Sequence, residues 1–132
     1  MATVPDSSSA RRSRLTDCWM LLLFLLCAGA VLYGLFRPAP PPNLFRESDK
    51  VLHLLAFATL ALTGRAALSR LPGIPFWGLL LVLAPMMEWA QHIVQPVRHF
   101  SLEDALANLT GILLAGLCWW LVKAGARLKS RG

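Results

Sequence analysis

The segment EWAQHIVQPVRHFSLEDALANLTG, Glu88–Gly111, lies between two long apolar stretches and gathers carboxylates, histidines, amides and an arginine. The chain around it is 56% hydrophobic and 15% charged over 132 residues. A soluble domain of this size could not cover so much apolar surface, so most of the chain must face lipid or other helices. The polar residues of this segment therefore need a particular location.

Four apolar stretches are long enough to cross a bilayer, since about 20 residues rising 1.5 Å each span a hydrocarbon core of roughly 30 Å. They cover residues 18–36, 51–68, 74–94 and 105–122. We expect an all-α integral membrane protein with four transmembrane helices in up-down topology, forming one domain over residues 18–122. A polar basic leader, 1–17, and a basic tail, 123–132, flank this domain.

The first apolar stretch follows a leader rich in Ser and Arg, which is also how a cleavable signal peptide begins. Ala28-Gly29-Ala30 would offer a small-residue cleavage site. The apolar run nevertheless continues to Phe36, beyond the length of a signal-peptide core. We therefore expect an uncleaved span.

The basic residues near the span ends predict the orientation, because cytoplasmic loops carry an excess of Lys and Arg. With the N-terminus inside, the cytoplasmic side holds nine of them: Arg11, Arg12, Arg14, Arg65, Arg70, Lys123, Arg127, Lys129 and Arg131. The other side holds four: Arg37, Arg46, Lys50 and Arg98. Both termini are therefore expected in the cytoplasm.

The net charge of +6 does not predict nucleic-acid binding, because the basic residues flank apolar segments and form no stripe with interleaved aromatics. Anionic lipid headgroups are the expected partners. The three cysteines, Cys18, Cys27 and Cys118, all lie within apolar runs. They fit neither a disulfide framework nor a metal-ligand spacing, and none has the electropositive setting of a nucleophile.

Consecutive spans joined by short loops alternate in direction, so the start of the second span, the end of the third and the start of the fourth must share one membrane face. The polar residues gather at these three places. We expect an outward-facing pocket that binds a ligand through Asp49, Lys50, His53, Glu88, Gln91, Arg98, Ser101, Asp104 and Asn108. Glu88, His53 and Asp104 are the catalytic candidates within this set.

Glu88 is the residue that packing alone explains least. It lies about 9 Å from the outer end of its span, where a lone carboxylate is costly. We expect Arg98 to pair with it, with Lys50 and His53 as alternatives.

Other members of the set have a structural interpretation beside the functional one. Ser101 and Asp104 fit a capping box at the start of the fourth span. Asn108, Gly111 and Ala115 fit a small-residue packing seam with one interhelical hydrogen bond, a seam through which the chain could also form a homo-oligomer. His53 could be held by Asp49, one helical turn earlier. Both interpretations stay open.

His53, Glu88 and His92 are possible metal ligands. The Glu-x-x-x-His spacing of the last two residues differs from the two-histidine helix motif of metalloproteases and lacks a fixed third ligand. The sequence therefore predicts no metal and no cofactor.

The polar residues also resemble the VanZ-like family of small bacterial membrane proteins. The resemblance covers residues 49 to about 116 and rests on Asp49-Lys50-x-x-His53-x-x-x-Phe57, Glu88-x-x-Gln91 and Arg98-x-x-Ser101-x-x-Asp104-x-x-x-Asn108-x-x-Gly111. The chain departs from the family at Val97, where members commonly carry a Gly before the Arg. The resemblance implies a bacterial cytoplasmic-membrane location and a part in teicoplanin resistance.

Three functions follow as hypotheses. The first is a binding module for a lipid headgroup or amphiphile, such as a lipid-linked cell-wall precursor or a lipoglycopeptide. The second is an integral-membrane enzyme that acts on a lipid-linked substrate through acid and base groups. The third is a scaffold in which the polar residues only hold the helices together.

Overall fold

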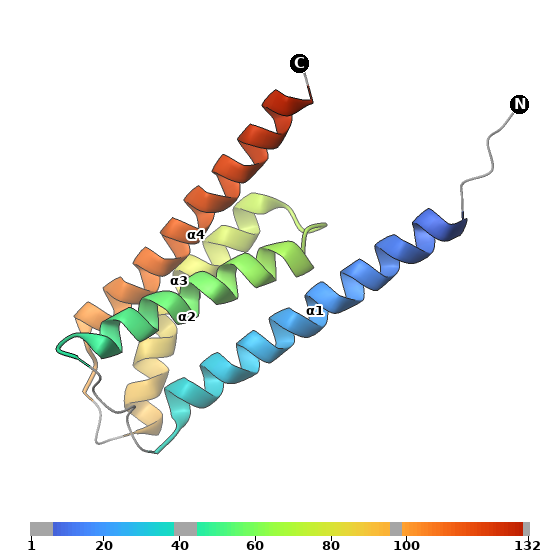
Figure 1. Cartoon of the computed structure of the whole chain (residues 1–132). Coiled ribbons are helices and arrows are strands. Elements are labelled where there is room, and N and C mark those ends of the chain that lie inside the picture. The colour runs from blue at the N-terminus through green and yellow to red at the C-terminus, as the bar shows by residue number, and fades with distance from the viewer. Residues whose placement is uncertain (1–6, 39–44, 96–98, 131–132) are drawn as a thin grey trace, which may run out of the picture.

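The computed structural model describes residues 7–38, 45–95 and 99–130, and within them it is helical, with no strand. The four helices are α1 (Ser7–Phe36), α2 (Ser48–Ala67), α3 (Gly73–Val94) and α4 (Leu102–Lys129) (Figure 1). The expected Arg98 and most of the proline-rich connection, 39–44, lie outside the described residues.

Each helix is long and apolar enough to cross a membrane, over Ser13–Phe36, Ser48–Ala67, Gly73–Val94 and Leu102–Lys129. Large apolar side chains remain exposed on every helix, among them Leu26, Leu55, Leu79 and Leu117. Such surfaces suit hydrocarbon and not water. The prediction of an all-helical chain with four helices long and apolar enough to span a membrane is confirmed for the described residues, and it supports a multi-pass membrane protein.

The first and last helices, α1 and α4, are longer than the apolar stretches that predicted them. α1 begins at Ser7, within the polar leader, and α4 continues to Lys129, through most of the basic tail. Backbone hydrogen bonding continues past the last apolar residue as long as each residue tolerates helical geometry. Hydropathy therefore located the spans but not the ends of these two helices.

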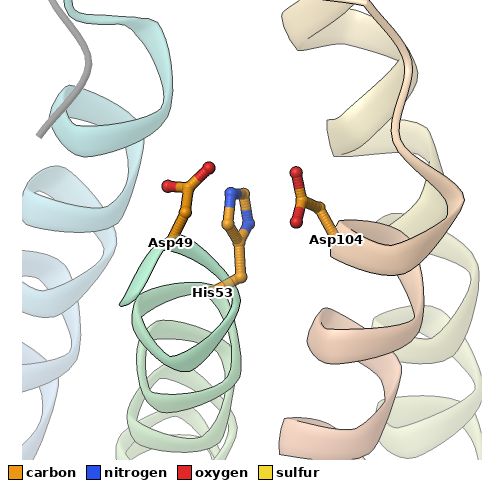
Figure 2. Close-up of side chains that lie close together, drawn as sticks. All are labelled: Asp49, His53 and Asp104. Carbon is orange, nitrogen blue, oxygen red and sulfur yellow. The ribbon is translucent and has the colours of Figure 1, made fainter. Parts of the chain in front are cut away.

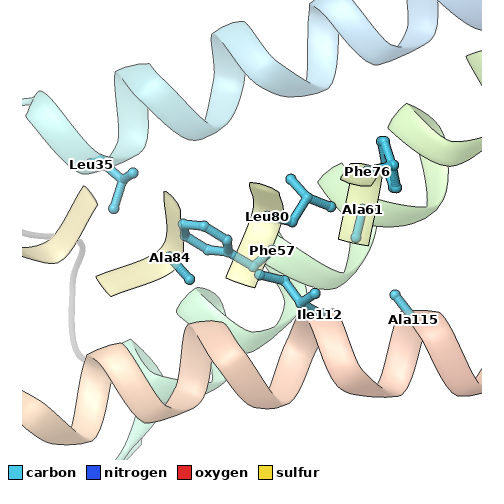
Figure 3. Packing of buried hydrophobic residues seen from close by; sticks show 8 residues of the cluster. All are labelled: Leu35, Phe57, Ala61, Phe76, Leu80, Ala84, Ile112 and Ala115. Atoms are coloured by element: carbon cyan, nitrogen blue, oxygen red, sulfur yellow. The ribbon is translucent and has the colours of Figure 1, made fainter. Parts of the chain in front are cut away.

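α2 and α4 pack very closely, and Gly111 is the reason. A Cβ on Gly111 would fall against the Leu54 carbonyl oxygen and 3.0 Å from the Ala58 nitrogen, so a side chain there would push the two helices apart. The buried apolar cluster beside this contact joins all four helices (Figure 3): Leu35, Phe57, Ala61, Phe76, Leu80, Ala84, Ile112 and Ala115.

The start of α1 and the end of α4 lie at the same end of the bundle (Figure 1). There Arg65 closes the end of α2, with Nη1 donating to the Leu68 and Leu71 carbonyls at 3.0 and 3.2 Å. Its guanidinium also lies 5.6 Å from the ring of Trp119. These contacts keep the cation at the end of its span, where a terminal arginine is tolerated.

Candidate functional site

At the opposite end of the bundle, which we call the polar end, the end of α1 is fastened to α3. The Gln91 side chain, 2% exposed, donates from Nε2 to the Leu35 carbonyl at 2.8 Å. Gln95 donates in the same way to the Arg37 carbonyl at 2.6 Å. The last carbonyls of a helix have no partner within it, so both amides satisfy groups that burial would otherwise leave unbonded.

Glu88 is 3% exposed, and its Oε1 accepts the backbone N–H of Ser101 at 3.1 Å. Ser101 is the expected N-cap of α4, since its Oγ accepts the N–H of Asp104 at 3.2 Å. In a capping box the N3 residue would satisfy the N–H of Ser101. Here Glu88, from α3, takes that role, and its negative charge lies at the N-terminus of α4, where the helix dipole favours it.

Lys50 forms ion pairs with Glu47 and with Glu103, so it is not the partner of Glu88 and its charge is shared between two carboxylates. Glu47 precedes α2 with a left-handed backbone, φ 102°. The spacing of Glu47 and Lys50 could have predicted the first pair. The second pair joins α2 to α4, and only the packing of those helices places Glu103 beside Lys50.

His53, Asp49 and Asp104 lie together at the polar end (Figure 2). One potential ligand atom from each residue lies within 4.8 Å of the others. His53 is 6% exposed, and its Nδ1 lies 3.0 Å from Oδ1 of the fully buried Asn108. The imidazole is thus held by Asn108 across the helix interface, in place of the bond to Asp49 that the sequence suggested.

This cluster differs from the possible ligand set suggested by the sequence, which combined His53 with Glu88 and His92. In the structure Glu88 accepts a hydrogen bond at the start of α4, and the residues beside His53 are Asp49 and Asp104. The i,i+4 spacing of Asp49 and His53 was visible in the sequence. The approach of Asp104 depends on the α2–α4 contact at Gly111.

Two cavities meet at this cluster. The apolar cavity, about 460 Å³, lies between α1 and α2 and is lined mainly by apolar and small residues, including Cys27, Ala30, Val31, Gly34, Leu52, Leu55 and Ala56. Asp49, His53 and Gln91 also line it. The polar cavity, about 640 Å³, is lined by Phe45, Arg46, Glu47, Ser48, Asp49, Lys50, Ser101 and Asp104. Asp49 borders both.

Comparisons with protein-family models, curated proteins and solved structures found no match to this chain. The resemblance to the VanZ-like family therefore rests on the motif residues between Asp49 and Gly111 alone.

Proposed function

We propose that this protein binds an amphiphile, with the apolar chain of the ligand in the apolar cavity and its headgroup in the polar cavity. The observation that carries the proposal is the position of Asp49, which lines both cavities. A pocket that is apolar between α1 and α2 and polar beyond Asp49 matches the two halves of an amphiphile.

The chemistry of the polar cavity favours a headgroup with hydroxyls or an amine. Ser48, Ser101, Asp49 and Asp104 offer hydroxyl groups and carboxylate acceptors. Lys50 and Arg46, the cations that line this cavity, would suit a phosphate, but Lys50 is paired with two glutamates and Arg46 lies 4.0 Å from Glu47. A sugar-bearing or amine-bearing lipid therefore fits better than a bare phosphate.

We further propose that both termini lie in the cytoplasm of a bacterium and that the polar end faces the outer leaflet of the cytoplasmic membrane. The loop charges and the VanZ-like resemblance support this orientation. The amphiphile would then be a lipid-linked cell-wall precursor or a lipoglycopeptide such as teicoplanin, and binding it would lower susceptibility to that drug.

Gly34 and Gly29 provide a matched test, because both lie on α1 and a Cβ at either meets no atom within 4 Å. Gly34 lines the apolar cavity and Gly29 does not. We expect Gly34→Leu to fill the cavity and weaken amphiphile binding by about tenfold or more, while Gly29→Leu binds like the wild type. Native mass spectrometry of the full-length protein, released from micelles with its co-purified lipids, measures the bound amphiphile.

Teicoplanin, with vancomycin as a comparator that lacks the acyl chain, is the added probe. Equal amphiphile binding by both leucine variants and the wild type would contradict the proposal. Retention of co-purified lipid that is sensitive to Gly34→Leu, without teicoplanin binding, would keep the amphiphile site and reject the resistance role. Susceptibility of a Gram-positive host expressing the same variants extends the test to cells.

Catalysis on the bound amphiphile is a second candidate, favoured by the position of His53 beside two carboxylates. In that case His53 would act as the general base, with Asp49 or Asp104 stabilising its protonated form. The same spectra test this, because turnover would change the mass of the bound amphiphile in the wild type but not in His53→Gln. An unchanged mass in both proteins would remove this candidate.

A further inference from the structure

We propose that Asp49, His53 and Asp104 bind one divalent metal ion at the polar end of the bundle. This inference goes beyond amphiphile binding and does not depend on it, because the three donors are assembled by α2 and α4 alone. It differs from the expectation, based on the sequence, that no metal binds.

The orientation of the His53 ring suits a metal ligand. Its Nδ1 is engaged by Asn108, which leaves Nε2 as the ring nitrogen available to a ligand. When Nδ1–H donates to the Asn108 oxygen, Nε2 carries the lone pair, which is the tautomer that binds metals. Metal-binding histidines usually have their other nitrogen fixed in this way by a neighbouring acceptor.

Asn108 itself supports this interpretation. It is fully buried, and its Nδ2 has no hydrogen-bond partner in the described part of the chain. Burying an amide without satisfying it costs free energy. The hydrogen bond to His53 therefore accounts for the presence of an amide at this buried position, and that bond sets the orientation of the imidazole.

The negative charges around His53 also favour a bound cation. The imidazole stands between the carboxylates of Asp49 and Asp104 (Figure 2), and within the described residues neither carboxylate forms an ion pair. Buried carboxylates in proteins are usually paired with a cation or coordinate a metal. A metal ion bound between Asp49 and Asp104 would satisfy both carboxylates and the imidazole at once.

The donor set indicates the class of ion. One imidazole with two carboxylates suits Zn²⁺ or Mn²⁺ better than Mg²⁺ or Ca²⁺, which prefer oxygen ligands alone. Donors to one ion lie up to roughly 4 Å apart, so small side-chain rotations close the site from its 4.8 Å spacing. Asp49 and Asp104 also line the polar cavity, which leaves room for water or a headgroup oxygen as a further ligand.

Equilibrium dialysis tests the proposal, with Zn²⁺ and Mn²⁺ as separate probes and Mg²⁺ as a comparator. The full-length protein is purified in detergent without a polyhistidine tag, stripped with chelator and then analysed for bound metal. We expect one Zn²⁺ or Mn²⁺ per chain in the wild type. Asp49→Asn and Asp104→Asn should each weaken binding by about tenfold or more.

Glu103→Gln is the matched control, since Glu103 is the sequence neighbour of Asp104 but pairs with Lys50 and does not belong to the cluster. It should bind metal like the wild type. Circular dichroism and gel filtration identify any variant that has not folded. Because both Asp→Asn changes keep the side-chain shape, we expect these two variants to fold like the wild type.

A visible spectrum with Co²⁺ as the probe reports on the nitrogen ligand, and His53→Gln should alter it. No saturable binding in the wild type would overturn the proposal. So would binding of unchanged affinity in both Asp→Asn variants, because the ion would then lie elsewhere on the protein.

Discussion

Glu88 is an acid buried in an apolar bundle, and its bond to the N–H of Ser101 gives it a definite task. The Glu88 carboxylate accepts the N–H of the N-cap residue, as the N3 residue of the same helix does in a capping box. This bond gives Glu88 a structural role at the start of α4, while His53, Asp49 and Asp104 form a separate cluster suited to ligand chemistry.

Replacing Glu88 separates its hydrogen bond from its charge. Glu88→Gln keeps an acceptor for Ser101 and should lower the free energy of unfolding by about 0.5–1 kcal/mol through the lost helix-dipole interaction. Glu88→Ala should cost about 1–3 kcal/mol, because it leaves the partly buried N–H of Ser101 without the Glu88 acceptor. Thermal unfolding in detergent measures both, with Glu103→Gln as an exposed control.

The order of these two variants is the informative result. If Glu88→Gln were as destabilising as Glu88→Ala, the negative charge itself would be required for stability, and the hydrogen bond to Ser101 alone would not explain the burial of Glu88.

The helices were predictable as elements because each apolar stretch has the length of a membrane span. Their alternation also predicted that the polar residues of α2, α3 and α4 would gather at one end. What the sequence could not predict were the partners across helices. The bonds of His53 to Asn108 and of Glu88 to Ser101 depend on how α2, α3 and α4 are rotated and spaced.

The small-residue seam on α4 was predicted correctly as a packing surface, but the chain uses it internally. Gly111 and Ala115 are buried within the chain, Gly111 against α2. They are therefore not exposed to a second copy. An oligomer would have to form through another face, such as the exposed apolar side of α1.

Gly111→Ala tests the element contact that assembles the site. The added Cβ would collide with backbone atoms of α2, and overpacking of this kind costs about 1–3 kcal/mol. Gly116→Ala is the control on the same helix, since its Cβ would lie 3.8 Å from the Trp77 ring, an ordinary contact. Thermal unfolding should show a lower melting temperature for Gly111→Ala alone, and an equal melting temperature for both variants would contradict the close α2–α4 packing.

For the whole molecule, the distribution of charge is the most informative feature. The chain carries +6 overall, yet five of its seven acidic residues belong to the polar end: Glu47, Asp49, Glu88, Glu103 and Asp104. Glu88 accepts a hydrogen bond from Ser101, and Glu47 and Glu103 both form ion pairs with Lys50. Asp49 and Asp104 remain beside His53 for a ligand.

The molecule thus combines an apolar helical bundle with an apolar cavity and a polar cavity that share Asp49. Photo-crosslinking tests this most directly, with a lipid that carries a diazirine at the end of its acyl chain, incorporated with the full-length protein into vesicles. We expect cross-links concentrated on the cavity-lining residues of α1 and α2, such as Val31 and Leu55, and their loss in Gly34→Leu but not in Gly29→Leu. Uniform labelling of all lipid-exposed faces, with the same pattern in both variants, would contradict the amphiphile site.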